Sequence, residues 1–261
     1  MKQKVRETCR YKLKAILLIL VVFFVSKWSC WRRRAAMANV SIRKYRNSDY
    51  DVVHSLFAEG MMEHLPATCF HLLKLPQVHL ALSLSLLLVF MATSSYLLPL
   101  ATLVVVLTGA WYELNSEFRQ YVSQSQKDDL LDIEKTYMMR SNSCFWVSES
   151  GGKVAGMVAA QPSEESEDEM VLRRLSVGRE HRMKGIAKAL CLEVMDFARQ
   201  CGYKSVKLET SMVQYAAHKL YESLGFEKTA VVILPTFFGR FSNFFIFTYR
   251  YRIKSSSNHS H

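Results

Sequence analysis

The chain has 261 residues, and its 34 Lys and Arg against 23 Asp and Glu give a formal net charge of +11. Residues 1–46 hold 13 of the basic side chains and one acid, whereas the rest of the chain sums to −1, which argues against a nucleic-acid-binding domain with its own basic patch. A content of 50% hydrophobic and 12% aromatic residues is too high for a disordered chain and sufficient for a folded core.

The first predicted element is a basic leader, residues 1–36. It contains an uninterrupted apolar run at residues 15–25, with six basic side chains before it and four after it. A helix of this length rises about 16 Å, which is short of the roughly 30 Å hydrocarbon layer of a bilayer. The leader is therefore typical of a signal-peptide core, a short signal anchor or an interfacial segment, and Met37 is an alternative start that would omit it.

A second apolar segment, residues 75–112, contains no Asp, Glu, Lys or Arg. A polar break at residues 92–96 divides it into two dense apolar parts, and the whole segment is too long for one upright membrane helix. We expect an apolar hairpin of two helices embedded in a membrane, either as two tight crossings or as a re-entrant loop. A helix pair buried in a soluble protein is the alternative, although neither half has a polar face.

The remaining sequence, residues 38–252, predicts one mixed α/β domain that the apolar hairpin interrupts. A strand at residues 40–45 and a helix at residues 49–61 precede the hairpin. The elements predicted after it are a helix at 128–139, strands at 144–148, 153–160 and 170–177, a helix at 185–201, a strand at 203–208, a helix at 213–224, and strands at 226–234 and 244–251. Because the first strand joins the sheet of the later ones, both ends of the hairpin lie on one side of the membrane. Residues 253–261 are expected to be a disordered tail.

One junction in this domain suits an anion. The strand that ends at residue 177 leads through a short loop into the helix at 185–201, and the first amides of a helix have no partner inside it. These donors and the positive end of the helix dipole favour a phosphate group. Gly185 lets the backbone come close to an anion, and Ala187 keeps the next turn narrow. An ordinary tight turn at Gly185 is the alternative.

Two motifs in this order resemble the GNAT superfamily of acetyltransferases. Its Arg/Gln-x-x-Gly-x-Gly/Ala signature appears as Arg182, Gly185 and Ala187, and the Leu-Tyr-Glu-x-Leu-Gly-Phe end of its next motif appears at residues 220–226. Similarity to the N-acetyltransferase 8 and camello family of this superfamily is carried by residues 41–46, 60–68, 143–150 and 181–190. The resemblance implies the α/β GNAT fold, a mixed central sheet with flanking helices that an apolar membrane hairpin interrupts.

The resemblance also implies an acetyl-CoA-dependent N-acetyltransferase in endoplasmic reticulum or Golgi membranes, without a metal. The pyrophosphate of acetyl-CoA would bind the backbone at residues 182–187 and its pantetheine the preceding strand. The implied cofactor-binding residues are Leu175, Val177, Arg182, Met183, Lys184, Gly185, Ile186, Ala187 and Gln214. Tyr221 is the implied acid that protonates the leaving thiolate, with packing of a helix-face aromatic as the alternative. An amine must lose a proton to attack, and Glu209 at a strand end is the candidate base, although a solvated strand-end acid is equally consistent.

The acceptor side is less defined. Arg173 and Arg174 stand on a strand where such sites place an acid, and strand alternation sends them to opposite faces, so at most one points at the acceptor. We expect one of them to bind the carboxylate of an amino acid or a cysteine conjugate; a solvated arginine is the alternative. The acidic residues between 164 and 169 are equally able to attract a lysine-bearing protein.

The expected partners are therefore acetyl-CoA, a small or protein-borne amine and membrane lipid, with no nucleic acid. The six cysteines show neither metal-ligand spacing nor a disulfide framework. A second function class is also consistent with the sequence, a catalytically idle membrane protein that acts in adhesion, trafficking or membrane shaping. An intact Gly185, Ala187 and Tyr221 favour the enzyme.

Overall fold

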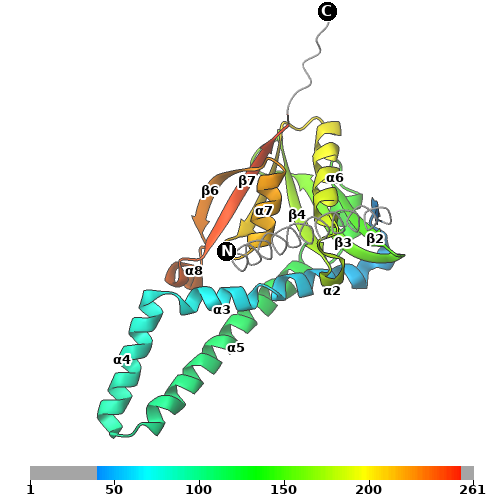
Figure 1. The fold of residues 1–261 in the computed structure, drawn as a ribbon. Coiled ribbons are helices and arrows are strands. Elements are labelled where there is room, and N and C mark those ends of the chain that lie inside the picture. Colours follow the sequence, from blue (N-terminus) through cyan, green and yellow to red (C-terminus); the bar gives the residue numbers. More distant parts are fainter. Residues whose placement is uncertain (1–39, 254–261) are drawn as a thin grey trace, which may run out of the picture.

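The computed structural model describes residues 40–253. The predictions for the leader and for the tail beyond Ile253 lie outside the described residues. The described chain is built on a seven-stranded sheet with the order β1-β2-β3-β4-β5-β7-β6 (Figure 1). The strands are β1 Val40–Lys44, β2 Cys144–Ser150, β3 Lys153–Pro162, β4 Glu169–Val177, β5 Ser205–Ser211, β6 Glu227–Ile233 and β7 Phe245–Arg252.

The sheet is mixed, as predicted. Neighbouring strands are antiparallel except for β4 and β5, which are parallel. β1 precedes the apolar hairpin and pairs with β2, which follows it, so one sheet spans the interruption. The β2–β3 connection is a tight turn in which Gly151 and Gly152 both have positive φ, 62° and 75°, as a two-residue hairpin turn requires.

Helices cover both faces of the sheet. One face carries α6 (Ile186–Gln200) and α7 (Tyr215–Ser223). The other carries α2 (Tyr50–Met62), the end of α5 and the short π-helix η2 (Glu134–Met138). The buried residues of α6 recur every three or four positions, which turns one apolar stripe to the sheet. The result is two apolar cores, one on each face.

The apolar hairpin consists of α4 (Pro76–Thr93) and α5 (Leu97–Lys127), which project from the domain, with α3 (Leu65–Leu73) lying across their base (Figure 1). Both arms are long and apolar enough to cross a membrane, judged by length and composition alone. No residue of α4 is buried, whereas a core helix of a soluble protein is mostly buried. The alternative of a helix pair buried in a core is therefore wrong.

Three parts of the chain differ from the predicted pattern. The helix predicted at residues 128–139 is replaced by a turn followed by η2. The helix that precedes it, α5, continues without a break to Lys127. The pattern does not predict α3 or α8 (Phe237–Ser242), which are nine and six residues long. Short 3-10 turns, η1 (Asn47–Asp49) and η3 (Arg179–His181), precede α2 and follow β4.

The β6–β7 connection lies against the base of the hairpin. α8 is next to α3 in Figure 1, and a His71 ring nitrogen is 2.7 Å from the carbonyl oxygen of Ser242. The side-chain amide of Gln77, in the first turn of α4, donates to the carbonyl oxygen of Phe241 at 3.0 Å. The end of the sheet formed by β6 and β7 is thereby joined to α3 and α4.

α2 approaches β4 closely at Gly60. A Cβ on Gly60 would lie 2.6 Å from Oγ of Ser176, whose hydroxyl donates to the carbonyl oxygen of Leu56 at 3.0 Å. A larger residue would force the Ser176 hydroxyl out of this position. This contact places the C-terminal end of α2, including Glu63, beside the segment that follows β4.

Candidate active site

The parallel strands β4 and β5 separate after three paired positions. Their register runs from Glu169 opposite Ser205 to Val171 opposite Lys207 and ends there, although β4 continues to Val177. We call this end of the pairing the fork. Beyond it, the facing edges of β4 and β5 have no strand partner within the described chain. Their backbone amides and carbonyls are therefore available to an extended ligand.

The loop between β4 and α6 presents backbone donors. Met183 and Gly185 both have positive φ, 60° and 82°, and Gly185 immediately precedes the first turn of α6. The amides of residues 183–188 donate no hydrogen bond to any residue that the structure describes. Left-handed residues ahead of a helix start direct such amides toward an anion. We call residues 182–187 the phosphate loop; they include six of the predicted cofactor-binding residues.

Arg182 connects the phosphate loop to two other elements. Its Nε donates to the carbonyl oxygen of Val177 at 3.0 Å, and its Nη1 forms an ion pair of 2.6 Å with Glu63 at the end of α2. Arg179 pairs with the same carboxylate at 3.2 Å. Burial raises the pKa of Glu63, but the hydrogen bond from Arg182 and the two positive charges outweigh burial and lower it overall. The signature arginine thus fixes the loop against β4 and α2.

Tyr221 lies on the α6/α7 face of the fork. Its side chain is buried in the same apolar cluster as Leu172 and Leu208, the first residues of β4 and β5 beyond the fork. The Tyr221 hydroxyl has no hydrogen-bond partner among the described residues. Burial, and secondarily the nearby Cys191, raises the pKa of this phenol. A phenol that stays protonated and has an unused hydroxyl suits a proton donor.

Gln214 closes the turn between β5 and α7. Its Oε1 accepts hydrogen bonds from the amide of Ser211 at 3.1 Å and from the hydroxyl of Thr210 at 2.5 Å. These bonds fix the start of α7, and therefore the position of Tyr221, relative to β5. The side-chain nitrogen of Gln214 makes no hydrogen bond in the part of the chain that the structure describes, which leaves it available to a ligand.

A bulge in β4 overrides the expected alternation of Arg173 and Arg174. The register of β4 against β3 shifts between Met157 and Ala159, so β4 carries an extra residue there, and Arg174 adopts φ 57°. The Arg174 guanidinium lies 4.8 Å from the centroid of the Phe57 ring on α2. Arg173 pairs with Ala159, which belongs to the core on that same face. The prediction that the two side chains point to opposite faces is therefore wrong.

The two arginines differ in what surrounds them. Arg174 forms a buried ion pair with Asp129, in which the side chains are 7% and 6% exposed. Arg173 is partly buried, and it has no hydrogen bond or ion pair with any described residue. Of the two arginines, Arg173 is therefore the one without a hydrogen-bond or ion-pair partner among the described residues.

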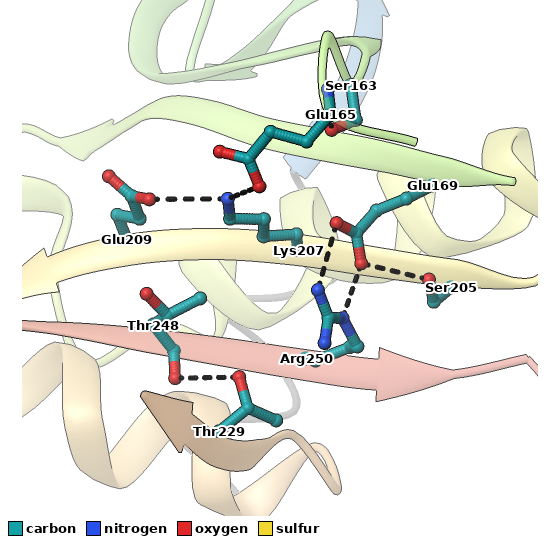
Figure 2. A network of polar contacts seen from close by, with 9 residues as sticks. All are labelled: Ser163, Glu165, Glu169, Ser205, Lys207, Glu209, Thr229, Thr248 and Arg250. Atoms are coloured by element: carbon teal, nitrogen blue, oxygen red, sulfur yellow. Dashed lines mark hydrogen bonds and ion pairs between the residues drawn. The ribbon is translucent and has the colours of Figure 1, made fainter. Parts of the chain in front are cut away.

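Glu209 lies on β5 beyond the fork, on the same face as Arg173. Continuing the parallel register past Val171 and Lys207 brings Arg173 level with Glu209. Figure 2 shows Lys207 between two carboxylates, with its Nζ 3.5 Å from Glu209 and 2.7 Å from Glu165. Burial lowers the pKa of Lys207, but the hydrogen bond to Glu165 and the two negative charges raise it overall. Lys207 is therefore a fixed positive charge beside Glu209.

The acidic loop between β3 and β4 is folded onto this face of the sheet. Its ion pairs are Glu165–Lys207, Asp168–Lys204 and Glu169–Arg250, the last with Glu169 at the start of β4 (Figure 2 shows the first and third). Glu169 is 3% exposed and also accepts a hydrogen bond from Ser205 at 3.0 Å. Much of the negative charge predicted to attract a partner is therefore neutralised within the protein.

The predicted site residues thus lie on the two faces of one fork. The phosphate loop and Tyr221 are on the α6/α7 face, Arg173 and Glu209 are on the α2 face, and the stretch of β4 with Leu175 and Val177 runs between them. Sequence reasoning missed Glu63, Lys207 and Asp129, whose contacts join distant segments. Of these three residues, only Glu63 could have been singled out from the sequence, because it lies in residues 60–68, one of the segments that resemble the N-acetyltransferase 8 and camello family. The described residues include no group of His, Cys, Asp and Glu that could hold a metal ion.

The chain is similar in sequence to known acetyltransferases. The model of the acetyltransferase (GNAT) family matches residues 109–226. The chain is 50% identical over 219 residues to a protein of Xenopus laevis named probable N-acetyltransferase camello, across 84% of this chain and 100% of that protein. It is 42% identical over 196 residues to N-acetyltransferase 8B of Homo sapiens, across 74% of this chain and 86% of that protein.

One solved structure with a TM-score above 0.5 shows the same fold. A GNAT-family acetyltransferase of Staphylococcus aureus Mu50 superposes with a TM-score of 0.51 at 15% identity, over 82% of this chain and 99% of that chain. The Salmonella typhimurium protein yncA, solved with acetyl-CoA, has a TM-score of 0.47 at 15% identity, over 84% of this chain and 96% of that chain. From its fold and its relatives, the chain belongs to the N-acetyltransferase 8 and camello family of GNAT acetyltransferases.

Proposed function

We propose that this protein is a membrane-anchored N-acetyltransferase that transfers the acetyl group of acetyl-CoA to the amine of a carboxylate-bearing acceptor, such as an amino acid or a cysteine conjugate. The observation that carries the proposal is the fork. It has unpaired strand edges, a phosphate loop with unpaired amides on one face, and an unpaired arginine level with a carboxylate on the other.

Acetyl-CoA fits the α6/α7 side of the fork. The amides of the phosphate loop would hold its pyrophosphate, and the β4 backbone at Leu175 and Val177 would pair with its pantetheine amides. The Val177 carbonyl oxygen already accepts a hydrogen bond from Arg182, so its remaining lone pair would accept the hydrogen bond from a pantetheine amide. The unused amide nitrogen of Gln214 is a further donor on this side. When bound, acetyl-CoA supplies the thioester carbonyl that the amine attacks.

The two proton transfers are assigned to opposite faces. Glu209 takes the proton of the acceptor amine, directly or through a water molecule, because only the neutral amine attacks. Lys207, 3.5 Å away, holds the Glu209 carboxylate in place. Tyr221 gives its phenolic proton to the leaving sulfur, and its raised pKa keeps that proton bound at neutral pH. Exchange with solvent then returns a proton to Tyr221 and removes one from Glu209.

Arg173 is assigned to the acceptor carboxylate. A guanidinium binds a carboxylate through two parallel hydrogen bonds, and this one has no partner among the described residues. An α-amino acid carries its amine and carboxylate on one carbon, which matches a base and a cation facing each other across the fork. A protein lysine is less well supported, because three of the five acidic side chains between residues 164 and 169 are already paired within the protein. Arg174, the other arginine predicted for the substrate, is occupied by Asp129.

The apolar hairpin and α3 are proposed to anchor the enzyme in endoplasmic reticulum or Golgi membranes, the compartments that the family resemblance implies. The exposed large apolar residues of the arms include Leu80, Leu84, Leu88, Met91, Leu100, Val105 and Trp111. On α3, Phe70 and Leu73 are 66% and 46% exposed, while Leu65 and Thr68 on its other side are buried. Because β1 and β2 pair across the hairpin, its two ends lie on one side of the bilayer.

The acceptor proposal is tested by acetyl-CoA consumption with detergent-solubilised full-length protein and a panel of amino acids, cysteine conjugates and lysine peptides. Turnover is expected with the first two classes. Turnover of lysine peptides alone would contradict the assignment of Arg173. The anchor is tested by alkaline carbonate extraction of microsomes. The wild type should stay in the pellet, a variant with Leu84, Leu88 and Val105 all replaced by Asp should be released, and release of both would contradict the anchor.

A further inference from the structure

The ion pair between Arg174 and Asp129 has no part in the transfer described above, although it is buried beside the site. Asp129 lies two residues beyond the end of α5, and Arg174 stands at the bulge of β4. Nε of Arg174 donates to Oδ2 of Asp129 at 2.8 Å, and a second hydrogen bond joins Nη2 to Oδ1. Two parallel hydrogen bonds give the pair a fixed geometry.

Three further side chains hold the pair. Tyr137 of η2 donates its hydroxyl to Asp129, and Nη1 of Arg174 donates to Oγ of Ser125 at 3.2 Å. The guanidinium also lies over the Phe57 ring of α2. Burial raises the pKa of Asp129, but the hydrogen bond and charge of Arg174 outweigh burial and lower it, so the carboxylate is ionised. Phe57 of α2, the end of α5 and the segment through η2 therefore determine where Arg174 lies.

The backbone at Arg174 needs such support. Its φ of 57° is in the left-handed region, which a residue with a Cβ disfavours and which persists only where the surroundings impose it. A buried ion pair seldom adds stability over an apolar pair of similar volume, and its best-attested use is to select one geometry. The bulge lies beyond the fork, so its conformation sets the direction of the β4 amides that face the ligand.

We infer that Arg174 and Asp129 are positioning residues for acetyl transfer: their ion pair holds the β4 bulge so that a backbone amide beyond the fork points at the carbonyl of the bound acetyl group. The inference rests on the proposed binding of acetyl-CoA in the fork. A donor fixed in that direction stabilises the negative charge that develops on the carbonyl oxygen. The pair also makes the end of α5, which continues from the apolar hairpin, part of the framework of the site.

The test compares Asp129→Asn with Asp196→Asn in the full chain in detergent. Both changes remove a carboxylate from an Arg–Asp pair, but Asp196 and its partner Arg199 are exposed on α6, at 57% and 52%. The readout is the infrared carbonyl band of bound, isotope-labelled acetyl-CoA, which moves to lower frequency when an amide donates to the carbonyl. The wild type and Asp196→Asn should share a lowered band. Asp129→Asn should show a band close to that of free acetyl-CoA, with its Kd within about threefold of wild type.

Kinetics with the best acceptor of the panel separate positioning from substrate binding. In Asp129→Asn we expect kcat to fall about 10- to 100-fold while KM for the acceptor is unchanged, as for a misdirected donor. If Arg174 instead bound the acceptor carboxylate, removing the charge of Asp129 would release the guanidinium and lower that KM. A lower acceptor KM, or a wild-type band together with a wild-type kcat, overturns the inference.

Two double variants distinguish an effect on the conformation of the β4 bulge from a general loss of stability. Arg174→Gly and Arg174→Ala, each combined with Asp129→Asn, remove the same charges, but only glycine adopts φ 57° without a penalty. The glycine variant should keep more of the lowered band and a kcat about 3- to 10-fold above that of the alanine variant. Equal bands and rates overturn the inference. The infrared readout needs no acceptor, so a failure of the acceptor panel leaves it intact, whereas a wild type that binds no acetyl-CoA overturns both proposals.

Discussion

Arg173 on β4 and Glu209 on β5 each stand two residues past the last position at which the strands pair, on the α2 face of the sheet. The same face carries Lys207, whose ammonium lies between Glu209 and Glu165. Beyond the fork, this face therefore carries a guanidinium with no hydrogen bond or ion pair to any described residue and a carboxylate held by a lysine. On this relationship we base the proposal that the acceptor binds on the α2 face, opposite Tyr221.

If Glu209 is the base, Glu209→Gln should lower kcat about 100- to 1,000-fold and leave KM for acetyl-CoA unchanged, because the amide cannot take the proton of the amine. The matched control is Glu227→Gln, an exposed acid on β6 that is distant from the fork in the strand order. The measurement is steady-state kinetics with the best acceptor. Equal kcat values for the two variants would remove Glu209 from the mechanism.

Tyr221→Phe should lower kcat by about 100- to 10,000-fold without weakening the thermal stabilisation by acetyl-CoA, since the ring remains and only the proton is lost. Tyr249→Phe is the control, because its hydroxyl donates to Glu222 at 3.1 Å and its ring also contacts that of Tyr221. That control should cost about 1 kcal/mol of stability and keep kcat. A parallel loss of binding and turnover in Tyr221→Phe would make Tyr221 structural.

The raised pKa of Tyr221 predicts the shape of the alkaline pH profile. An unperturbed tyrosine titrates near pH 10, so an ordinary phenol acid would cause kcat to fall as the pH approaches about 10. Burial keeps the proton on Tyr221, and kcat should stay level between about pH 8 and 10. A decline of kcat between pH 8 and 10 in the wild type, with a midpoint near the ordinary tyrosine value of about 10, would contradict a buried Tyr221 as the proton donor.

Gly185→Val should abolish the thermal stabilisation by acetyl-CoA, and Gly202→Val should not. Both glycines have φ 82° and flank α6, one before its first turn and one after its last, so the substitutions carry a similar backbone penalty of about 1–2 kcal/mol. Only Gly185 belongs to the phosphate loop. Differential scanning fluorimetry with and without acetyl-CoA measures the effect, and loss of the shift in both variants would point to general destabilisation instead.

Removal of Asp129 should destabilise the fold in a pH-dependent way. The pKa of Asp129 is lowered in the folded state. The stability that its carboxylate contributes is therefore fully present above the unfolded-state pKa of about 4 and is lost as the pH falls through the folded-state pKa. Asp129→Asn should therefore cost about 3–5 kcal/mol at pH 7 and progressively less below about pH 4. Denaturant unfolding at pH 7 and pH 3 measures both costs. A cost that is the same at both pH values would contradict the ion pair.

Local patterns predicted the parts of the molecule that local chemistry determines. The short connection between β2 and β3, the helix α6 and the loop with Gly185 all appear close to where the sequence places them, because a tight turn and a helix period each depend on a few adjacent residues. The two apolar arms were also visible, because their composition is extreme.

Contacts between distant segments were not predictable in this way. The bulge at Arg174 is a one-residue shift against β3, and alternation along β4 alone predicts the opposite direction for that side chain. Its partner Asp129 lies 45 residues earlier, just after α5. The sequence pattern did not predict that α5 extends to Lys127. α3 and α8 are short helices that take their positions from each other and from the base of the hairpin.

We propose that this acetyltransferase selects a carboxylate-bearing amine through Arg173. Steady-state kinetics test this selection by giving kcat/KM for one amino acid and for the corresponding amine without the carboxylate, in the wild type and in Arg173→Gln. The wild type should prefer the amino acid by about 100-fold or more, and Arg173→Gln should remove the preference while KM for acetyl-CoA stays the same. Equal kcat/KM for the two acceptors in the wild type would show that Arg173 does not select the carboxylate.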